Sequence, residues 1–280
     1  MGNRTIKRQV KAKTVNMGGH LLDQPLPHQF IESIDPFLLI HHWAEELPGN
    51  RRPQELGVPP HPHRGFSPVT FIFQGDVQHR DSLGNNSIVR GGGTQWINAG
   101  RGITHSERPS KALAEKGGMQ ELIQFWVNTP AAMKMKAPEY VALQEEDTPK
   151  YIGQNYQVAV VTGEQYGLKG PIAAQTSMLL LRGTTSGEVT IEHEIPEDFN
   201  ALIYVLDGDF LMDGKEVGDR QMVWLNNDGD SFEIESRGPG RYILLAGQPI
   251  GEKVTQYGPF VMNTQTEIMQ AMRDAQMGKM

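Results

Sequence analysis

The fold of this chain is decided by HPHRGF at residues 61–66 and GRGITHSE at residues 100–107. Each segment holds two potential metal ligands separated by one residue: His61 and His63 in the first, His105 and Glu107 in the second. On a β-strand, residues i and i+2 point to the same face. We therefore expect three imidazoles and one carboxylate to converge on one point. Such donors suit Fe, Mn, Ni, Cu or Zn and suit Ca or Mg poorly.

Short predicted strands, separated by turns, surround these two segments. The turn between them is GNN at residues 84–86, a composition typical of β-hairpins. Strands this short and this closely spaced indicate an antiparallel sandwich or barrel. The predicted strands are residues 69–73, 77–79, 88–90, 95–98 and 122–128.

A second series of predicted strands occupies the later half of the chain. Residues 134–150 are rich in proline and acidic side chains and are typical of a linker. TQTE at residues 264–267 is a capping box and predicts a helix over residues 268–272. We therefore predict an all-β protein of two antiparallel β-barrel domains, residues 1–138 with the metal site and residues 139–280 without one, ending in a short helix.

The two halves resemble distant copies of one another. FIFQGD at residues 71–76 is similar to YVLDGD at residues 204–209, which indicates a duplicated barrel. Counted back from the glycine of each copy, the position of His61 corresponds to Glu194, and no histidine lies near residues 228–230. The sequence therefore predicts one metal, in the first domain.

Composition excludes several classes of protein. The 280 residues carry a formal net charge of −7, which argues against direct binding to nucleic acid. There is no cysteine, so neither disulfides nor thiolate ligands are available. The first residues are charged and precede no apolar stretch, so we expect no signal peptide, no membrane span and a soluble cytoplasmic protein.

Several segments, in order along nearly the whole chain, resemble the pirin family of the cupin superfamily. They are PPHPHRGF (59–66), HRDSLGN (79–85), QW (95–96), AGRGI (99–103), HSE (105–107), QFWVN (124–128) and GPFVMNT (258–264). The resemblance implies a monomeric bicupin with two jelly-roll barrels. It also implies one iron, most simply Fe(II), held in the first barrel by His61, His63, His105 and Glu107.

The resemblance leaves two functions open. Some members of the family act as quercetin 2,3-dioxygenases on flavonol-like substrates and O2, and Glu107 would then be both ligand and catalytic base. Others are regulators, so the alternative is a non-enzymatic, iron-dependent redox sensor that binds a protein partner. One departure bears on this choice: the family commonly has Glu after HRGF, where this chain has Ser67.

Other polar residues have simpler interpretations than metal binding. His79 and Asp81 also have i, i+2 spacing, but the turn that follows predicts that Asp81 caps the hairpin through backbone amides. His41 and His42 are adjacent and face opposite sides of a strand, so they cannot chelate together. Most aromatic residues are first of all core candidates, although some must point into the barrel mouth: Phe71, Phe73, Trp96, Phe125 and Trp126.

Overall fold

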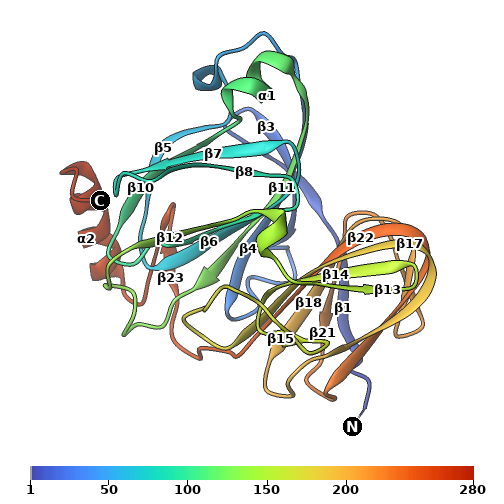
Figure 1. Ribbon diagram of the computed structural model, residues 1–280. Coiled ribbons are helices and arrows are strands. Elements are labelled where there is room, and N and C mark those ends of the chain that lie inside the picture. Colours follow the sequence, from blue (N-terminus) through green and yellow to red (C-terminus); the bar gives the residue numbers. More distant parts are fainter. Residues whose placement is uncertain (1) are drawn as a thin grey trace. The chain divides into compact units, whose positions relative to one another are not determined.

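Antiparallel strands make up most of the computed structural model, which describes residues 2–280 (Figure 1). The chain forms two compact units, each built from two stretches. Unit 1 is the chain up to Leu39 together with Asp147–Pro249, and unit 2 is Ile40–Glu146 together with Ile250–Met280. The predicted all-β fold with a short terminal helix is confirmed. None of the helices within residues 2–280 has the length and apolar character that a membrane crossing requires.

These compact units differ from the division expected from the sequence. The first residues pack with the later barrel, and the last residues pack with the earlier one. The linker-like composition indicates that the chain passes from one unit to the other near residue 147. It does not indicate to which unit the first and last residues of the chain belong. The consecutive division into residues 1–138 and 139–280 stays a prediction about domains.

Unit 2 contains two antiparallel sheets. The four-stranded sheet has the order β5 (Val58–His63), β10 (Ile103–Arg108), β7 (Asp76–Asp81) and β8 (Asn86–Arg90). The other sheet runs through β12 (Glu139–Leu143), β9 (Thr94–Asn98), β6 (Phe66–Gln74), β11 (Gly118–Asn128) and β4 (Phe37–Leu47).

The sequence of β11 shows why this sheet has two different faces. Ile123, Phe125 and Val127 are buried, whereas the residues between them are only partly covered. Strand side chains alternate between the two faces of a sheet, so this burial pattern assigns the apolar residues to the core. Gln124 and Trp126 lie on the opposite face.

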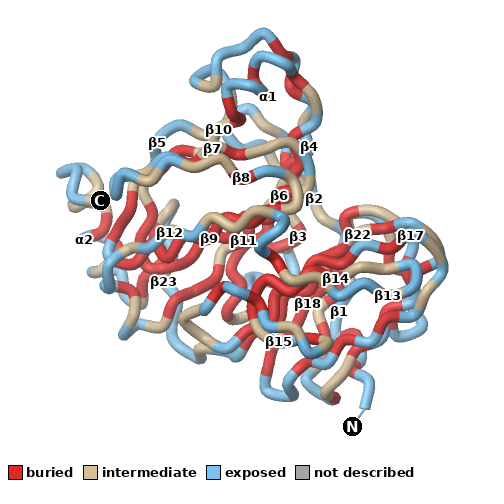
Figure 2. Tube along the Cα trace, in the orientation of Figure 1, coloured by how far each residue is buried: buried red, intermediate tan, exposed pale blue. Residues whose placement is uncertain are grey.

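Unit 1 contains a nine-stranded sheet. Its longest strands, β17 (Met178–Glu194) and β22 (Ser231–Gly247), pair along their full length from Met178 opposite Gly247 to Glu194 opposite Ser231. The rest of the sheet is formed by β1 (Ile6–Lys11), β21 (Gln221–Leu225), β18 (Asn200–Asp207), β14 (Tyr156–Thr162), β13 (Lys150–Gly153), β19 (Phe210–Met212) and β20 (Lys215–Val217). Figure 2 shows buried residues concentrated in central strands such as β18 and β22, whereas the edge strand β13 is largely exposed.

Three further antiparallel strand pairings complete the description of the strands. β2 (Lys13–Met17) pairs with β3 (His20–Leu26), and β15 (Glu164–Gln165) pairs with β16 (Leu168–Lys169). In unit 2, β23 (Thr255–Tyr257) pairs with β24 (Phe260–Met262).

Two α-helices and two short 3-10 helices lie among the strands. The predicted capping box is present: the Thr264 hydroxyl accepts from the Glu267 amide, and the Glu267 carboxylate accepts from the Thr264 amide. This box begins α2 (Gln265–Gln276). The sequence did not predict α1 (Lys111–Lys116), which Ser110 caps, because six residues are too few to show helical periodicity. The 3-10 helices are η1 (Pro53–Glu55) and η2 (Glu145–Asp147).

Candidate metal centre

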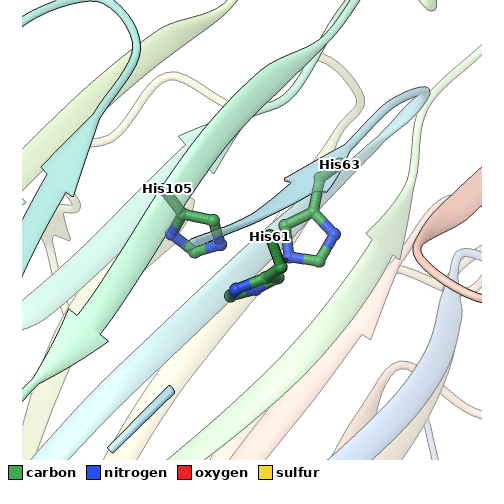
Figure 3. A group of neighbouring side chains, drawn as sticks. All are labelled: His61, His63 and His105. Atoms are coloured by element: carbon green, nitrogen blue, oxygen red, sulfur yellow. Dashed lines mark hydrogen bonds between the residues drawn. The ribbon is translucent and has the colours of Figure 1, made fainter. Parts of the chain in front are cut away.

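Strands β5 and β10 bring three histidines together, as Figure 3 shows. His61 and His105 are paired across the two strands, and His63 follows on the same face of β5. One ring nitrogen of each residue lies within 4.8 Å of the others. The ring centroids are 4.4 Å apart for His61 and His105 and 4.9 Å apart for His63 and His105. The i, i+2 spacing of the sequence thus produces the expected convergence for these three residues.

Hydrogen bonds orient the first two rings. The Nδ1 of His61 lies 2.9 Å from the carbonyl of Pro59, and the Nδ1 of His63 lies 3.4 Å from the carbonyl of Pro259. A carbonyl only accepts, so each Nδ1 carries the proton and each Nε2 has a free lone pair. These two Nε2 atoms face one another at 3.1 Å. Two lone pairs at this distance repel unless a cation lies between them.

The third ring has no hydrogen-bonding partner among residues 2–280. Both ring nitrogens of His105 are buried and unpaired. A buried polar atom left unpaired costs about 1–3 kcal/mol. A metal bond would satisfy one of these nitrogens, so the donor set fits a metal ion.

The electrostatics of the cluster favour the metal-binding form of histidine. Burial, with a smaller contribution from the neighbouring His61, lowers the pKa of His63 to about 3. Burial also lowers the pKa of His105 well below its ordinary value, with the other histidines adding to the effect. Both rings are therefore neutral at pH 7, and neutral imidazole is the form that binds divalent transition metals.

The carboxylate of Glu107 lies outside the group of three histidines. Its Oε2 accepts from the Gln124 amide at 2.9 Å, and its Oε1 accepts from the Gln95 amide at 3.3 Å. The pairing of β10 with β5 shifts register between His105 and Glu107, so Glu107 is opposite Val58. Sequence spacing could not reveal this irregularity. The role of Glu107 as a ligand stays a prediction.

His79 is a buried neighbour of the cluster and belongs to a different network. Its Nε2 donates to the Oδ2 of Asp81 at 2.9 Å, and its ring stacks on Tyr140 at 3.8 Å. The Oδ1 of Asp81 accepts from the amides of Leu83 and Asn85 at 2.9 and 3.0 Å. The predicted hairpin cap is therefore confirmed.

Aromatic rings border the cluster on the side of β6 and β11. Phe66 lies 5.0 Å and Trp126 lies 5.8 Å from the ring of His63. Phe71, Trp96 and Phe125 are buried, as expected for core residues. Trp126 is the predicted aromatic candidate that lies beside the histidines. Gln95 and Gln124 were missed as partners of Glu107, although the alternation of β11 could have indicated Gln124.

Ser67, the residue that departs from the family pattern, lies in a buried polar contact. Its hydroxyl donates to the Oδ1 of Asn98 at 2.9 Å, and the indole nitrogen of Trp96 donates to the same oxygen at 2.8 Å. Serine thus has a hydrogen-bonding role of its own at this position.

Residues of the later stretch of unit 2, Ile250–Met280, contact the turn that follows His63. The Nζ of Lys134 donates to the carbonyls of Gly65 at 2.6 Å and Val261 at 3.1 Å. Arg64 forms an ion pair of 2.8 Å with Asp274 in α2. Gly65 has φ +84°, and a Cβ there would lie 2.0 Å from the Val261 carbonyl, so the turn requires glycine.

Unit 1 has a buried histidine next to Glu194, the residue that corresponds to His61 by sequence. Glu194 is exposed, and its neighbour His193 is buried. The Nε2 of His193 lies 2.8 Å from the Tyr242 hydroxyl, and its Nδ1 lies 3.1 Å from the Tyr166 hydroxyl. Both nitrogens are thus engaged by tyrosines.

Comparison with known families gives two matches along the chain. A family model described as Pirin matches residues 19–127, and one described as Pirin C-terminal cupin domain matches residues 180–280. A pirin-like protein of Solanum lycopersicum is 35% identical over 281 residues, with 99% of this chain and 92% of that protein covered. Pirin of Homo sapiens is 34% identical over 250 residues, with 87% of this chain and 82% of that protein covered.

Two solved structures show the same fold. The quercetin 2,3-dioxygenase from Acinetobacter baumannii superposes with a TM-score of 0.93 at 29% identity, covering 99% of this chain and 98% of that one. A bacterial pirin from Escherichia coli in complex with nickel(II) has a TM-score of 0.66 at 20% identity, covering 88% of this chain and 98% of that one. The two barrels of this chain are therefore cupin-type.

Proposed function

The chain belongs to the pirin family, and on that basis we propose that it is a quercetin 2,3-dioxygenase-type oxidoreductase. Under this proposal it holds one Fe(II) ion with His61, His63, His105 and Glu107. Its substrates are flavonol-like molecules and O2. The observation that carries the proposal is the group of three converging imidazoles with facing or unpaired ring nitrogens.

The likeness to a solved quercetin 2,3-dioxygenase supports the reaction class, because it extends over almost the whole of both chains. The nickel-bound pirin supports only the shared fold. His and Glu donors are compatible with nickel as well as with iron, so the choice of Fe(II) rests on the family resemblance.

Protein groups around the histidines suit a planar, acidic substrate. Trp126, which is partly exposed, offers aromatic surface beside His63, and the buried Phe66 packs behind that histidine. The Glu107 carboxylate is held at both oxygens by glutamine amides, which fixes the direction in which it can accept a proton. Glu107 takes the proton of the flavonol hydroxyl and leaves the ring electron-rich. The metal, when bound, supplies Lewis acidity and the redox chemistry for reaction with O2.

The test combines metal analysis of anaerobically purified protein with an oxygen-electrode assay on quercetin. We expect near-stoichiometric iron and oxygen uptake that depends on quercetin. His61→Ala should lose both, whereas His20→Ala, a histidine outside the cluster, should keep both. Iron without oxygen uptake would reject the enzymatic part of the proposal, and wild-type iron content in His61→Ala would reject the ligand assignment.

Ser67 favours a second candidate, a non-enzymatic regulator that responds to the redox state of its iron. The family glutamate is replaced there by a serine engaged with Asn98, so one acidic group is absent from this region. A one-electron change at iron alters the local charge by one unit and could alter partner binding at the barrel mouth. Binding of a protein partner that differs between the Fe(II) and Fe(III) forms, without oxygen uptake, would support this function.

A further inference from the structure

A cleft of about 710 Å³ lies in unit 2, between strands of the four-stranded sheet on one side and residues 51–54 with α1 on the other. On β10, Ser106 and Arg108 line the cleft, and His105 of the metal centre also contributes to its lining. Five cationic side chains contribute to its wall: Arg51, Arg52, Arg80, Arg108 and Lys111.

The carboxylates of the cleft do not neutralise this charge. Asp81 has no exposed side-chain surface and is engaged by His79 and the hairpin amides. Glu115 lies 3.6 Å from Lys111, and Arg52 pairs at 3.3 Å with Glu55. Within residues 2–280, no carboxylate forms an ion pair with the remaining three cations, which are Arg51, Arg80 and Arg108. In a chain of net charge −7, this is a local concentration of positive charge.

One of these guanidinium groups is fixed in position. The Nη1 of Arg108 donates to the carbonyls of Pro53 at 2.9 Å and Leu56 at 3.1 Å. Carbonyls are neutral, so these bonds orient the group and leave its charge available. The loop itself is tightly packed, because a Cβ on Gly57 would lie 2.5 Å from the Glu107 carbonyl. An ordered cation loses little conformational entropy when it binds a ligand.

We propose that this cleft binds a small organic dianion, either a phosphate ester or a dicarboxylate. Guanidinium groups match the geometry of both anions and bind them through two parallel hydrogen bonds. The volume lies within the range of small-molecule sites, about 300–1,000 Å³. A long polyanion would also meet the overall negative charge of the protein, which repels it. The proposed anion site has His105 in its lining and so adjoins the metal centre, but anion binding goes beyond the proposed oxidation reaction.

The test is isothermal titration calorimetry of the metal-loaded protein with phenyl phosphate and, separately, with succinate. These probes distinguish the two sources of negative charge and are weak chelators, and metal content is measured before and after each titration. The variants are Arg80→Ala and Arg51→Ala. Arg90→Ala is the matched control, since Arg90 is exposed on β8 of the same sheet and does not line the cleft.

We expect saturable binding of at least one probe, weakened about tenfold by each of the two cleft substitutions and little changed by Arg90→Ala. Raising the salt concentration should weaken the same binding, because the side chains of Arg51 and Arg80 are exposed. No binding of either probe, equal loss in Arg90→Ala, or binding only of a long polyanion such as heparin would each overturn the proposal.

Discussion

The position of the Glu107 carboxylate is set by amide groups on neighbouring strands. Gln124 on β11 donates to Oε2 and Gln95 on β9 donates to Oε1. Such contacts decide whether a carboxylate near a metal acts as ligand, as base or as both. Outer partners of metal ligands typically contribute about 10–100-fold to metal affinity or activity.

Replacing Gln124 by Ala should therefore lower quercetin-dependent oxygen uptake by about 10–100-fold and weaken iron binding less. Glu107→Gln should abolish oxygen uptake and also weaken iron binding, because it removes the negative charge of the carboxylate. Stopped-flow oxygen consumption with parallel metal analysis checks both variants. Gln78→Ala, on the outer face of β7, is a control that should behave as wild type. Full turnover in Glu107→Gln would exclude the carboxylate as the base.

His193 makes a pH-dependent contribution to the stability of unit 1. Burial lowers its pKa from 6.5 to about 3. In this pH interval the unfolded chain binds a proton that the folded chain does not, so stability is fully present above pH 6.5 and falls as the pH is lowered toward 3. The loss is at most about 1.4 kcal/mol per pH unit for one group.

We expect His193→Asn to unfold with a shallower dependence on pH than wild type between about pH 6 and 4. Chemical denaturation followed by fluorescence at several pH values measures this slope. The substitution also removes contacts with Tyr166 and Tyr242, so its stability at pH 7 should be lower. Equal slopes for the two proteins would show that His193 titrates normally in the fold.

At the residue scale, the sequence predicts the placement of the three histidines well and the placement of Glu107 poorly. Alternation along a strand is a local property, so His61, His63 and His105 could be placed on one face from spacing alone. The orientation of Glu107 depends on a register shift between β5 and β10 and on glutamines from two other strands. The cap formed by Asp81 was predictable because a hairpin turn is also local.

Among the elements, the β23–β24 pair and α2 act as an outer support of the metal centre. The Pro259 carbonyl orients His63, and Lys134 joins the turn after His63 to Val261. Burial lowers the pKa of Lys134 to about 8, and its three hydrogen bonds use all three of its donors. This lysine is therefore a structural bridge between segments distant in sequence.

Lys134→Met should accelerate the release of iron by about tenfold, because the turn beside His63 loses its connection to β24. The rate is measured by transfer of metal to a coloured chelator. Lys136→Met, at an exposed position two residues later, serves as the matched control. Equal release rates for the two variants would contradict a supporting role for β24.

Elements with strong local signals were predictable, and their partners were not. The capping box gave the start of α2, yet nothing in it indicates that the helix belongs to unit 2. The brief α1 escaped notice because its one clear signal is the Ser110 cap. Pairings between segments at opposite ends of the chain depend on tertiary packing, which single-sequence patterns do not encode.

At the scale of the whole molecule, the two barrels share one fold but differ in the polar residues that they enclose. Unit 2 holds the three histidines, and unit 1 holds His193 between two tyrosines. A metal that binds only the native state stabilises the unit that contains it, by about 2.7 kcal/mol when its concentration is 100 times the dissociation constant.

Calorimetric scans of metal-loaded and chelated protein should therefore differ in the transition of unit 2 and leave that of unit 1 unchanged. His61→Ala should resemble the chelated wild type with or without added iron. A shift of the same size in both transitions, or in His61→Ala, would show that the ion acts elsewhere.

The carbonyl that orients His63 belongs to a residue 196 positions later in the chain. A ribosome therefore releases all the histidines of the cluster long before it has made Pro259 and Val261, which complete their surroundings. During translation the early barrel cannot present its finished binding geometry. We therefore expect tight capture of a metal ion only after nearly the entire polypeptide has been synthesised.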